Sequence, residues 1–257
     1  MAAKLNYKVF GEGEPVIILH GLFGMLDNWQ TFAKALAKDY MVYIVDQRDH
    51  GKSEHTNDFN YYLLAEDLKH FLEDQWIYEA RFIGHSMGGK TLLQFSSMYE
   101  DLVQQMMIVD IGKKKYLGGH ELIIDSLNSV PITQIETRGE AESTLSKNIE
   151  DKGVIQFLLK NLKRKKEGGY EWKMNLDLLT IKYPHILDSI DFDHSIDTSS
   201  LFVRGSKSNY ISTKDFDDLL KIIPNSSLAT LHAGHWVHAE KPLELLDLTK
   251  KFFQEKN

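Results

Sequence analysis

The sequence contains no cysteine, and this absence removes several kinds of chemistry at once. Without cysteine the chain can form no disulfide, thiolate zinc site or iron–sulfur cluster, and it has no cysteine nucleophile. A long hydrophobic run is also absent, because the most apolar stretch, at about residues 15–25, is too short to span a membrane and contains His20. The first seven residues lack the apolar core of a signal peptide, so we expect a soluble, cytoplasmic protein.

The charge balance is mildly acidic, with 30 Lys and Arg against 37 Asp and Glu residues and a formal net charge of −7. We therefore do not expect nucleic acid as a partner, because phosphate binding needs a net basic face. The 257 residues, of which 42% are hydrophobic and 26% charged, can bury a substantial core. These values are typical of an ordinary globular chain.

Short apolar runs alternate with helical patterns along most of the chain. Such alternation predicts an α/β fold with a parallel sheet whose strands are buried on both faces. We expect residues 5–10 and 11–14 to form an edge strand and a hairpin turn. The other expected strands are 15–19, 41–45, 80–83, 106–109, 201–203 and 228–231, and the expected helices are 29–38, 61–74, 89–99, 214–220 and 242–254.

This alternation stops between about residues 112 and 197. The segment has helical patterns at 120–130, 140–149 and 154–162, but no strand of the parallel kind. We therefore expect a helical cap at 112–197, inserted into an α/β core that comprises residues 1–111 and 198–257, all within a single structural unit.

Residues 84–88, Gly-His-Ser-Met-Gly, follow a predicted strand and open a predicted helix, which is the setting of a nucleophile elbow. In such an elbow a strained turn pushes the serine hydroxyl out of the sheet edge, and the flanking Gly84 and Gly88 leave room for the turn. The N-terminus of the helix adds positive potential where an oxyanion forms. We expect Ser86 to be a nucleophile. The alternative is a chance match in an ordinary strand-to-helix turn.

Residues 20–24, His-Gly-Leu-Phe-Gly, follow the strand expected at 15–19. In an α/β-hydrolase this loop donates one backbone N–H of the oxyanion hole, and the residue after the nucleophile donates the other. We expect the donors to be Leu22 or Phe23, and Met87, with Leu22 and Phe23 also lining the substrate pocket. The alternative is a glycine-rich turn without a role.

His235 follows the last expected strand and precedes the last helix, which is where a hydrolase of this type carries its general base. We expect Trp236 beside it to contact the substrate. His232 and His238 share with His235 a spacing of three that resembles a metal site. Gly234 and the β-rich residues before it argue against one helical face, so we expect no metal here.

The other histidines near these motifs have simpler interpretations. We expect His232 and His238 to be structural, and His20 and His85 to pack around the elbow.

Several segments together resemble the α/β-hydrolases, and more narrowly the YbfF-type bacterial esterases. The resemblance spans nearly the whole chain and implies a mostly parallel central sheet flanked by helices, with a helical cap inserted after the sixth sheet strand. It also implies hydrolysis of carboxylic esters and acyl-thioesters, including acyl-coenzyme A, with no cofactor and no metal. The matching segments are 20–28, 46–53, 84–90, 154–160, 183–186 and 233–242.

The catalytic acid departs from the commonest pattern. Where most α/β-hydrolases have the acid, this sequence has Ser208, which cannot balance an imidazolium. Asp110 ends the neighbouring strand and keeps the order serine, acid, histidine, so we predict that it is the acid. The resemblance supports Asp110 and implies Ser208 as an added partner. The alternative is a capping or loop carboxylate at 110, and Asp215 and Asp217 are poorer candidates in the first turn of a helix.

Basic clusters at 113–115 and 163–166 lie in the expected cap. Such clusters are most often solvated surface, and the functional alternative is a site for the phosphates of coenzyme A. Two other functions share the same triad: a small-molecule receptor with little turnover, and a cofactor-free perhydrolase. We expect a monomer or homodimer that acts on a small-molecule ester or acyl-CoA.

Overall fold

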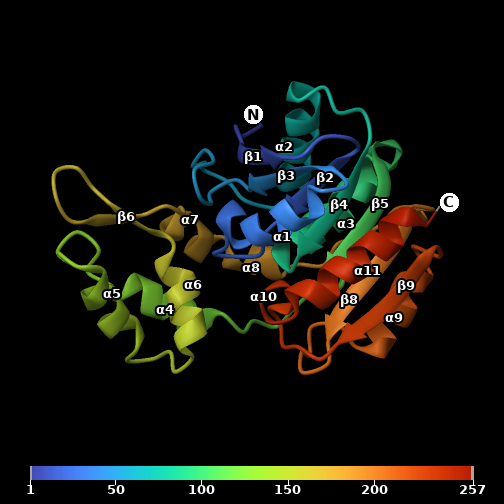
Figure 1. Ribbon diagram of the computed structural model, residues 1–257. Helices are drawn as coiled ribbons and strands as arrows, with labels where there is room; N and C mark the ends of the chain where they lie inside the picture. Colours follow the sequence, from blue (N-terminus) through green and yellow to red (C-terminus); the bar gives the residue numbers. More distant parts are fainter. Residues whose placement is uncertain (1, 256–257) are drawn as a thin grey trace.

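The computed structural model describes residues 2–255 and contains a central seven-stranded sheet with helices on both faces (Figure 1). The strand order is β1-β3-β2-β4-β5-β8-β9. Only β1 runs antiparallel to its neighbour, and every other neighbouring pair is parallel. The strands are β1 (Asn6–Phe10), β2 (Pro15–Leu19), β3 (Met41–Asp46), β4 (Ala80–His85), β5 (Val103–Val109), β8 (Ser199–Gly205) and β9 (Ser226–Leu231).

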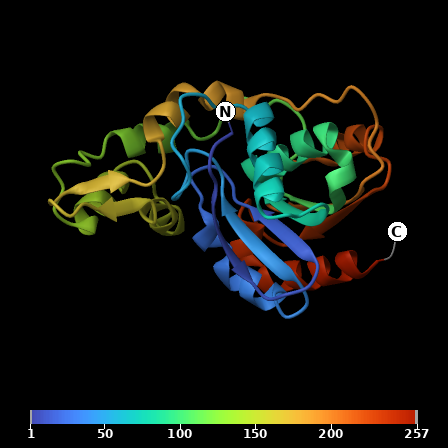
Figure 2. The same cartoon turned by 90° about the horizontal axis from the view of Figure 1, so that it is seen from above.

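Alternate residues of the central strands pack into two separate cores, one on each face of the sheet. In β2, Ile17 and Leu19 belong to the core under α2 (Tyr61–Asp74), α3 (Met87–Met98) and α9 (Thr213–Leu220). Val16 and Ile18 belong to the core under α1 (Gln30–Leu36) and α11 (Pro242–Gln254). Figure 2 shows the two helical layers on opposite sides of the sheet. This double burial explains why the strands appear in the sequence as unbroken apolar runs.

The expected strands and core helices are present, with ends that differ by up to three residues. The hairpin expected at 11–14 is wrong, because β1 pairs with β3 and not with β2. Both edges of β2 are already occupied by β3 and β4, so the chain must cross to the far side of β3. Short helices η1 (Leu26–Asn28), η2 (Glu100–Leu102) and α10 (Val237–Glu240) lie in the connections.

The segment between β5 and β8, which we call the cap, extends to one side of the sheet (Figure 1). The cap follows β5, the fifth strand of the described chain, and not a sixth strand as expected. A short antiparallel hairpin in it was not expected. Its elements are α4 (Glu121–Asn128), α5 (Arg138–Leu145), α6 (Lys152–Leu159), β6 (Leu162–Arg164), β7 (Tyr170–Trp172), α7 (Leu176–Ile181) and α8 (Tyr183–Leu187).

Buried side chains of the cap and of the α2/α3 face form one continuous apolar cluster. Ile124, Leu127 and Leu158 of the cap belong to this cluster together with Ile17 of the sheet. The cap is therefore packed on the core and does not have a separate interior. Within residues 2–255, no helix is both long and apolar enough to cross a membrane.

Candidate active site

Ser86 lies at the turn between β4 and α3, with a backbone φ of 51°. A non-glycine residue rarely adopts such a value, and holding it costs on the order of 1–3 kcal/mol. The turn is tight: a Cβ on Gly84 would lie 2.5 Å from the carbonyl oxygen of Gly88, and one on Gly88 would lie 2.6 Å from that of Leu19. Only glycine fits at both positions, so the local sequence dictates the elbow that presents the Ser86 hydroxyl.

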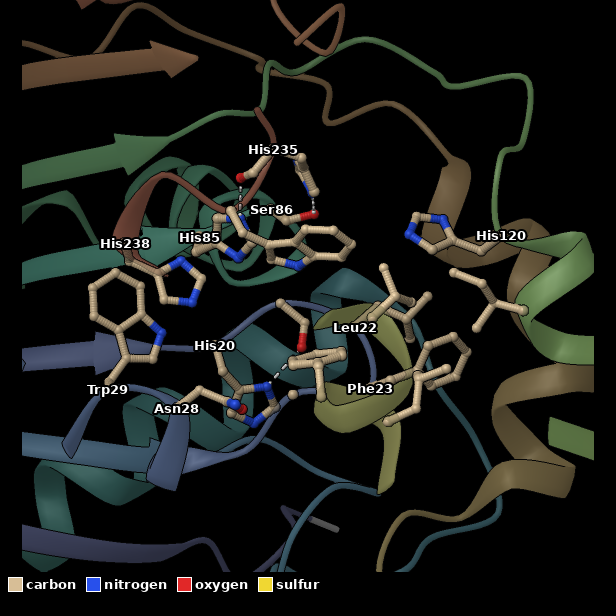
Figure 3. A pocket seen from close by; sticks show the side chains of 17 residues that line it. His20, Leu22, Phe23, Asn28, Trp29, His85, Ser86, His120, His235 and His238 are labelled. Atoms are coloured by element: carbon tan, nitrogen blue, oxygen red, sulfur yellow. Dashed lines mark hydrogen bonds between the residues drawn. The ribbon is translucent and has the colours of Figure 1, made fainter. Parts of the chain in front are cut away.

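Ser86, His235 and Asp110 form a hydrogen-bonded chain at the carboxyl edge of the sheet. The Nε2 atom of His235 is 3.0 Å from the Ser86 Oγ, and its Nδ1 atom is 2.8 Å from Asp110 Oδ2. Figure 3 shows the His235 ring above Ser86 at one side of a pocket. The imidazole can therefore take the Ser86 proton while the carboxylate orients the ring.

Asp110 is 1% exposed and follows β5 with a φ of 52°. Its Oδ1 accepts the Gly205 N–H at 2.9 Å, and its Oδ2 accepts both His235 and the Ser208 hydroxyl. Ser208 thus bonds to the carboxylate, at the end of the adjacent β8. The two strand ends meet as the parallel sheet predicts, and the expected pair of Asp110 and Ser208 is brought together.

The two weaker acid candidates lie elsewhere. Asp215 caps α9 by accepting from Ser212, and its carboxylate also pairs with Lys114 at 2.7 Å. Asp217 is exposed on the same helix. Neither carboxylate bonds to His235.

The backbone N–H groups expected to form an oxyanion hole differ in whether they already have a hydrogen-bond partner. The Phe23 N–H is already bonded to His50 Nε2 at 3.3 Å, whereas the backbone N–H groups of Leu22 and Met87 have no hydrogen-bond partner within residues 2–255. Of the expected alternatives, Leu22 is therefore the free donor on its loop. Together with Met87 it flanks Ser86, and Figure 3 shows the Leu22 side chain in the same pocket.

His20 and His50 are neutral imidazoles that hydrogen-bond to the backbone of this loop. Burial lowers the pKa of His20 to about 4 and that of His50 to about 3. Each ring bonds through Nδ1 to a backbone carbonyl and through Nε2 to a backbone N–H, that of Gln47 for His20 and that of Phe23 for His50. Because each Nε2 must accept, these partners fix the tautomer as the Nδ1–H form in both rings.

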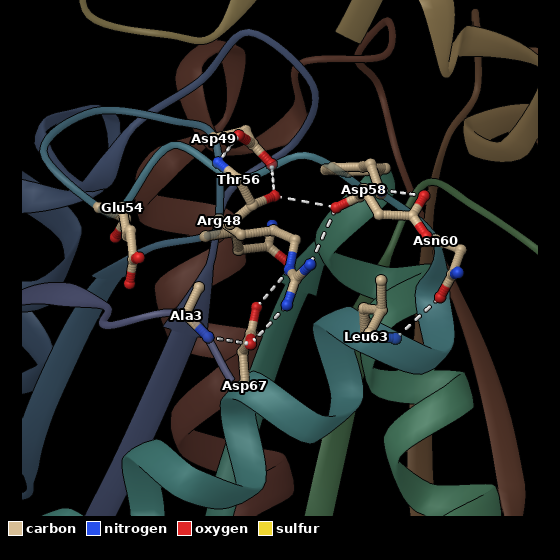
Figure 4. Close-up of polar contacts among 12 residues, drawn as sticks. Ala3, Arg48, Asp49, Glu54, Thr56, Asp58, Asn60, Leu63 and Asp67 are labelled. Atoms are coloured by element: carbon tan, nitrogen blue, oxygen red, sulfur yellow. Dashed lines mark hydrogen bonds and ion pairs between the residues drawn. The ribbon is translucent and has the colours of Figure 1, made fainter. Parts of the chain in front are cut away.

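A buried ion pair anchors the segment that carries His50 (Figure 4). Arg48 contacts Asp67 of α2 through two hydrogen bonds of 2.5 and 2.7 Å, and both side chains are nearly inaccessible. Arg48 also donates to the carbonyl of Asp58, and the Ala3 N–H donates to Asp67. Burial raises the pKa of Asp67, and the guanidinium opposes this shift. The pair fixes the loop under the oxyanion hole.

The three histidines with metal-like spacing have different surroundings. His235 lies between Ser86 and Asp110, His238 stacks on Trp29 with 4.5 Å between ring centroids, and His232 lies 3.1 Å from Ser206 Oγ. His85 donates from Nε2 to the His235 carbonyl at 2.9 Å, and its ring packs between the rings of His235 and His238. Across residues 2–255, no three His, Asp or Glu side chains are grouped to hold a metal ion.

The cap contributes residues that the sequence analysis missed. His120 faces Ser86 across the pocket in Figure 3, and its burial and the nearby His235 lower its pKa to about 4. Asn161, at the end of α6, donates from Nδ2 to the Phe23 carbonyl at 2.8 Å. The N–H of Phe23 is thus held by His50 of the core and its carbonyl by Asn161 of the cap. On the core side, Tyr210 stacks on the His235 ring, with 3.9 Å between centroids. No local motif signals any of these contacts.

Trp236 lines the pocket beside His235, as expected for a substrate contact. Among the basic clusters, three lysines are in ion pairs: Lys114 with Asp215, Lys115 with Asp188, and Lys163 with Glu171. Residues 163–166 lie on β6 and its turn, at the end of the cap most distant from the sheet in both views (Figures 1 and 2).

Comparisons with known proteins identify the family of the fold. The model of the alpha/beta hydrolase fold family matches residues 14–242. The chain is 36% identical over 246 residues to the esterase YbfF of Escherichia coli (strain K12), covering 94% of this chain and 93% of that protein. It is 34% identical over 264 residues to the sn-1-specific diacylglycerol lipase ABHD11 of Danio rerio, covering 98% and 83%. A solved structure of a marine microorganism esterase superposes with a TM-score of 0.96 at 38% identity, covering 98% of this chain and 100% of that one. The chain therefore belongs to the α/β-hydrolase family.

Proposed function

We propose that the protein is a serine hydrolase that cleaves carboxylic esters through an acyl-enzyme. The observation that carries this proposal is the series of hydrogen bonds from Ser86 through His235 to Asp110. Beside it lie two backbone N–H groups, of Leu22 and Met87, that have no partner among residues 2–255. The similarity to proteins named as esterases and as a diacylglycerol lipase supports the same chemistry.

The reaction follows from the positions of these groups. The Ser86 Oγ attacks the carbonyl carbon as His235 Nε2 takes its proton, and Asp110 stabilises the imidazolium. The oxyanion receives hydrogen bonds from the N–H groups of Leu22 and Met87. Collapse breaks the bond to the leaving group, which takes the proton from His235. Water then attacks the acyl carbon as His235 Nε2 takes its proton. The bond to Ser86 Oγ breaks, Oγ takes that proton back from His235, and the acid is released.

Acyl-coenzyme A thioesters fit the same sequence of steps, with sulfur as the leaving atom, and we include them in the proposal. The basic cluster at 163–166 gives this little support, because it lies on the distant hairpin. Lys160 is better placed for an anionic leaving group, since it lines a groove next to the active site.

Turnover of p-nitrophenyl acetate and butyrate tests the proposal. We expect rates above about 1 s⁻¹, an ordinary enzyme rate, and we expect a fluorophosphonate probe to label the peptide that carries Ser86. Ser86→Ala should lose both. Labelling without turnover would indicate a receptor of low activity, and full activity in Ser86→Ala would overturn the mechanism. A perhydrolase would instead form peracid from acetate and peroxide.

A further inference from the structure

Ser86 lines two cavities, one closed and the other continuous with an open groove. The first, which we call the tyrosine pocket, measures about 30 Å³, and its lining includes Tyr61, Tyr116, Tyr183 and Tyr210. That space is roughly twice what a single water molecule needs. The second is a narrow cavity of about 20 Å³ beside His235, which shares residues with a groove of about 430 Å³ that we call the outer groove.

The chemistry of acyl transfer distinguishes the two sides. The leaving group must be near His235, because the imidazolium protonates it as the tetrahedral intermediate collapses. His235 lines the cavity that leads to the outer groove and does not line the tyrosine pocket. Met87, which follows Ser86 and is the expected oxyanion donor, lines the tyrosine pocket and does not line the cavity beside His235. The acyl chain therefore points into the tyrosine pocket.

Hydrogen bonds to the backbone make the wall of the tyrosine pocket stiff. The Tyr61 hydroxyl donates to the Ile186 carbonyl at 2.8 Å, and the Tyr116 hydroxyl donates to the Tyr210 carbonyl at 2.8 Å. Tyr183 accepts the backbone N–H of His120 at 3.0 Å.

The far end of the pocket is closed as well. The buried Lys90 ammonium donates to the carbonyl oxygens of Lys114 and Leu187 at 3.4 Å, and also to that of Asp188. Widening this pocket would break several of these bonds, and a buried donor or acceptor left unpaired costs about 1–3 kcal/mol.

The two aromatic rings shared by the inner cavity and the outer groove make no such bonds within residues 2–255. Phe157 of α6 and Trp236 are half-buried, with 6.1 Å between ring centroids, and both line the inner cavity and the outer groove. The groove reaches the surface, because the exposed Ala239, Glu240 and Lys160 also line it. A large group can therefore leave the site past these two rings.

We propose that the tyrosine pocket receives the acyl group and the outer groove receives the leaving group. The protein then selects short acyl chains and tolerates bulky leaving groups. This assignment rests on the proposed hydrolysis and adds a substrate class to it.

Two substrate series test the assignment in the intact protein. In the first, the p-nitrophenyl leaving group is constant and the acyl chain lengthens from acetate to octanoate. We expect kcat/KM to fall at least about tenfold between butyrate and octanoate, since a single methylene in a closed pocket changes selectivity by about tenfold or more. In the second, the acetyl group is constant and the leaving group changes from phenol to 1-naphthol. Here we expect a change of less than about threefold.

Two matched variants then separate the pockets. Ile186→Ala removes a side chain from the wall of the tyrosine pocket and keeps the carbonyl that Tyr61 uses. It should raise the octanoate-to-acetate ratio of kcat/KM by about fivefold or more and leave the naphthyl-to-phenyl ratio unchanged. Phe157→Ala should leave the octanoate-to-acetate ratio unchanged, because Phe157 does not line the tyrosine pocket, and any change should be in the naphthyl-to-phenyl ratio. Ile186→Val serves as a milder variant, and circular dichroism checks the fold of each.

The outcomes are distinct for the two proposals. Equal kcat/KM for all acyl lengths in the wild type, or an acyl-length change caused by Phe157→Ala and not by Ile186→Ala, overturns the pocket assignment while hydrolysis stands. If the wild type turns over no ester and Ser86 is not labelled, the proposed function itself fails, and the assignment fails with it.

Discussion

The sheet side and the cap side of the site hold their residues by different means. On the sheet side, Ser86 and Asp110 lie directly at strand ends, both with positive φ, and Asp110 is fixed by three donors. On the cap side, His120 and Asn161 reach the site from helices that touch the core through side chains. Backbone-fixed groups suit bond making, which tolerates little displacement, whereas side-chain contacts suit selection of a substrate.

The largest effect is expected on the sheet side, at Asp110. Asp110→Asn removes the charge that stabilises the His235 imidazolium and alters the tautomer of the ring. In the serine-protease template this change lowers kcat by about 10⁴, so we expect a loss of roughly 10²–10⁴. The measurement is kcat on a short p-nitrophenyl ester, with circular dichroism to check the fold.

Ser208→Ala and Asp215→Asn are controls for that substitution. Ser208 donates one of the three hydrogen bonds that the Asp110 carboxylate accepts, so its loss should cost roughly tenfold in kcat, the lower end of the scale for a hydrogen bond to a charged group. Asp215 bonds only at the helix cap and to Lys114, so Asp215→Asn should leave kcat within about threefold. A folded Asp110→Asn enzyme with near wild-type kcat would remove Asp110 from the mechanism.

The buried imidazoles under the oxyanion loop make the sheet side sensitive to acid. Folding lowers the pKa of His20 to about 4 and that of His50 to about 3, from 6.5. A lowered pKa means that the unfolded chain binds these protons first. Their contribution to stability is therefore complete above pH 6.5 and is lost as the pH falls from 6.5 toward 4. At pH 5.5 the free energy of unfolding should therefore be about 1.4 kcal/mol lower for each of these rings than at neutral pH.

Urea unfolding at pH 7.5, 6.5 and 5.5 measures this loss. His50→Gln removes one of five imidazoles whose pKa is lowered by burial, the others being His20, His85, His120 and His238, so it should reduce the dependence on pH by about a fifth. His70→Gln changes an exposed imidazole beside Glu73 and should leave the dependence as in the wild type. Equal wild-type stability at pH 7.5 and 5.5 would mean that His20 and His50 are not buried as neutral rings.

Asn161 joins the two sides, since it is a cap residue bonded to the loop of the oxyanion hole. Asn161→Ala leaves the Phe23 carbonyl without this donor and loosens the Phe23–Gly24 peptide, in the loop that carries Leu22. We expect kcat to fall about tenfold with little change in KM, the free energy of about one hydrogen bond made to the loop. Asn128→Ala is the matched control, because that cap amide bonds only to Thr180. An equal effect of both substitutions would assign the loss to general loosening of the cap.

Sequence reasoning succeeded where a site is encoded by neighbouring residues. The elbow at Ser86 and the loop of His235 each lie within a few consecutive positions, and Asp110 with Ser208 follows from the register of parallel strands. It could not find Asn161 or Tyr210, because Asn161 meets a residue 138 positions away and Tyr210 stacks on a ring brought to it by another strand. The choice of Leu22 over Phe23 depended on His50, which no motif links to that loop. The hairpin of β6 and β7 has only three residues in each strand, too few for a periodic pattern.

The smallest effect is expected from the charges of the cap. Most of the attraction for an anionic leaving group should come from Lys160, which is exposed at the outer groove, because Lys114, Lys115 and Lys163 are in ion pairs. Attraction by an exposed charge is screened over about 8 Å at physiological salt, so KM for acetyl-coenzyme A should rise only about twofold to threefold as salt is added. KM for a neutral acetate ester should stay constant. Lys160→Met should remove the difference between the two salt curves, whereas Lys165→Met on the distant hairpin should preserve it. Parallel salt curves for the two substrates in the wild type would leave Lys160 as solvated surface and the groove selective by shape alone.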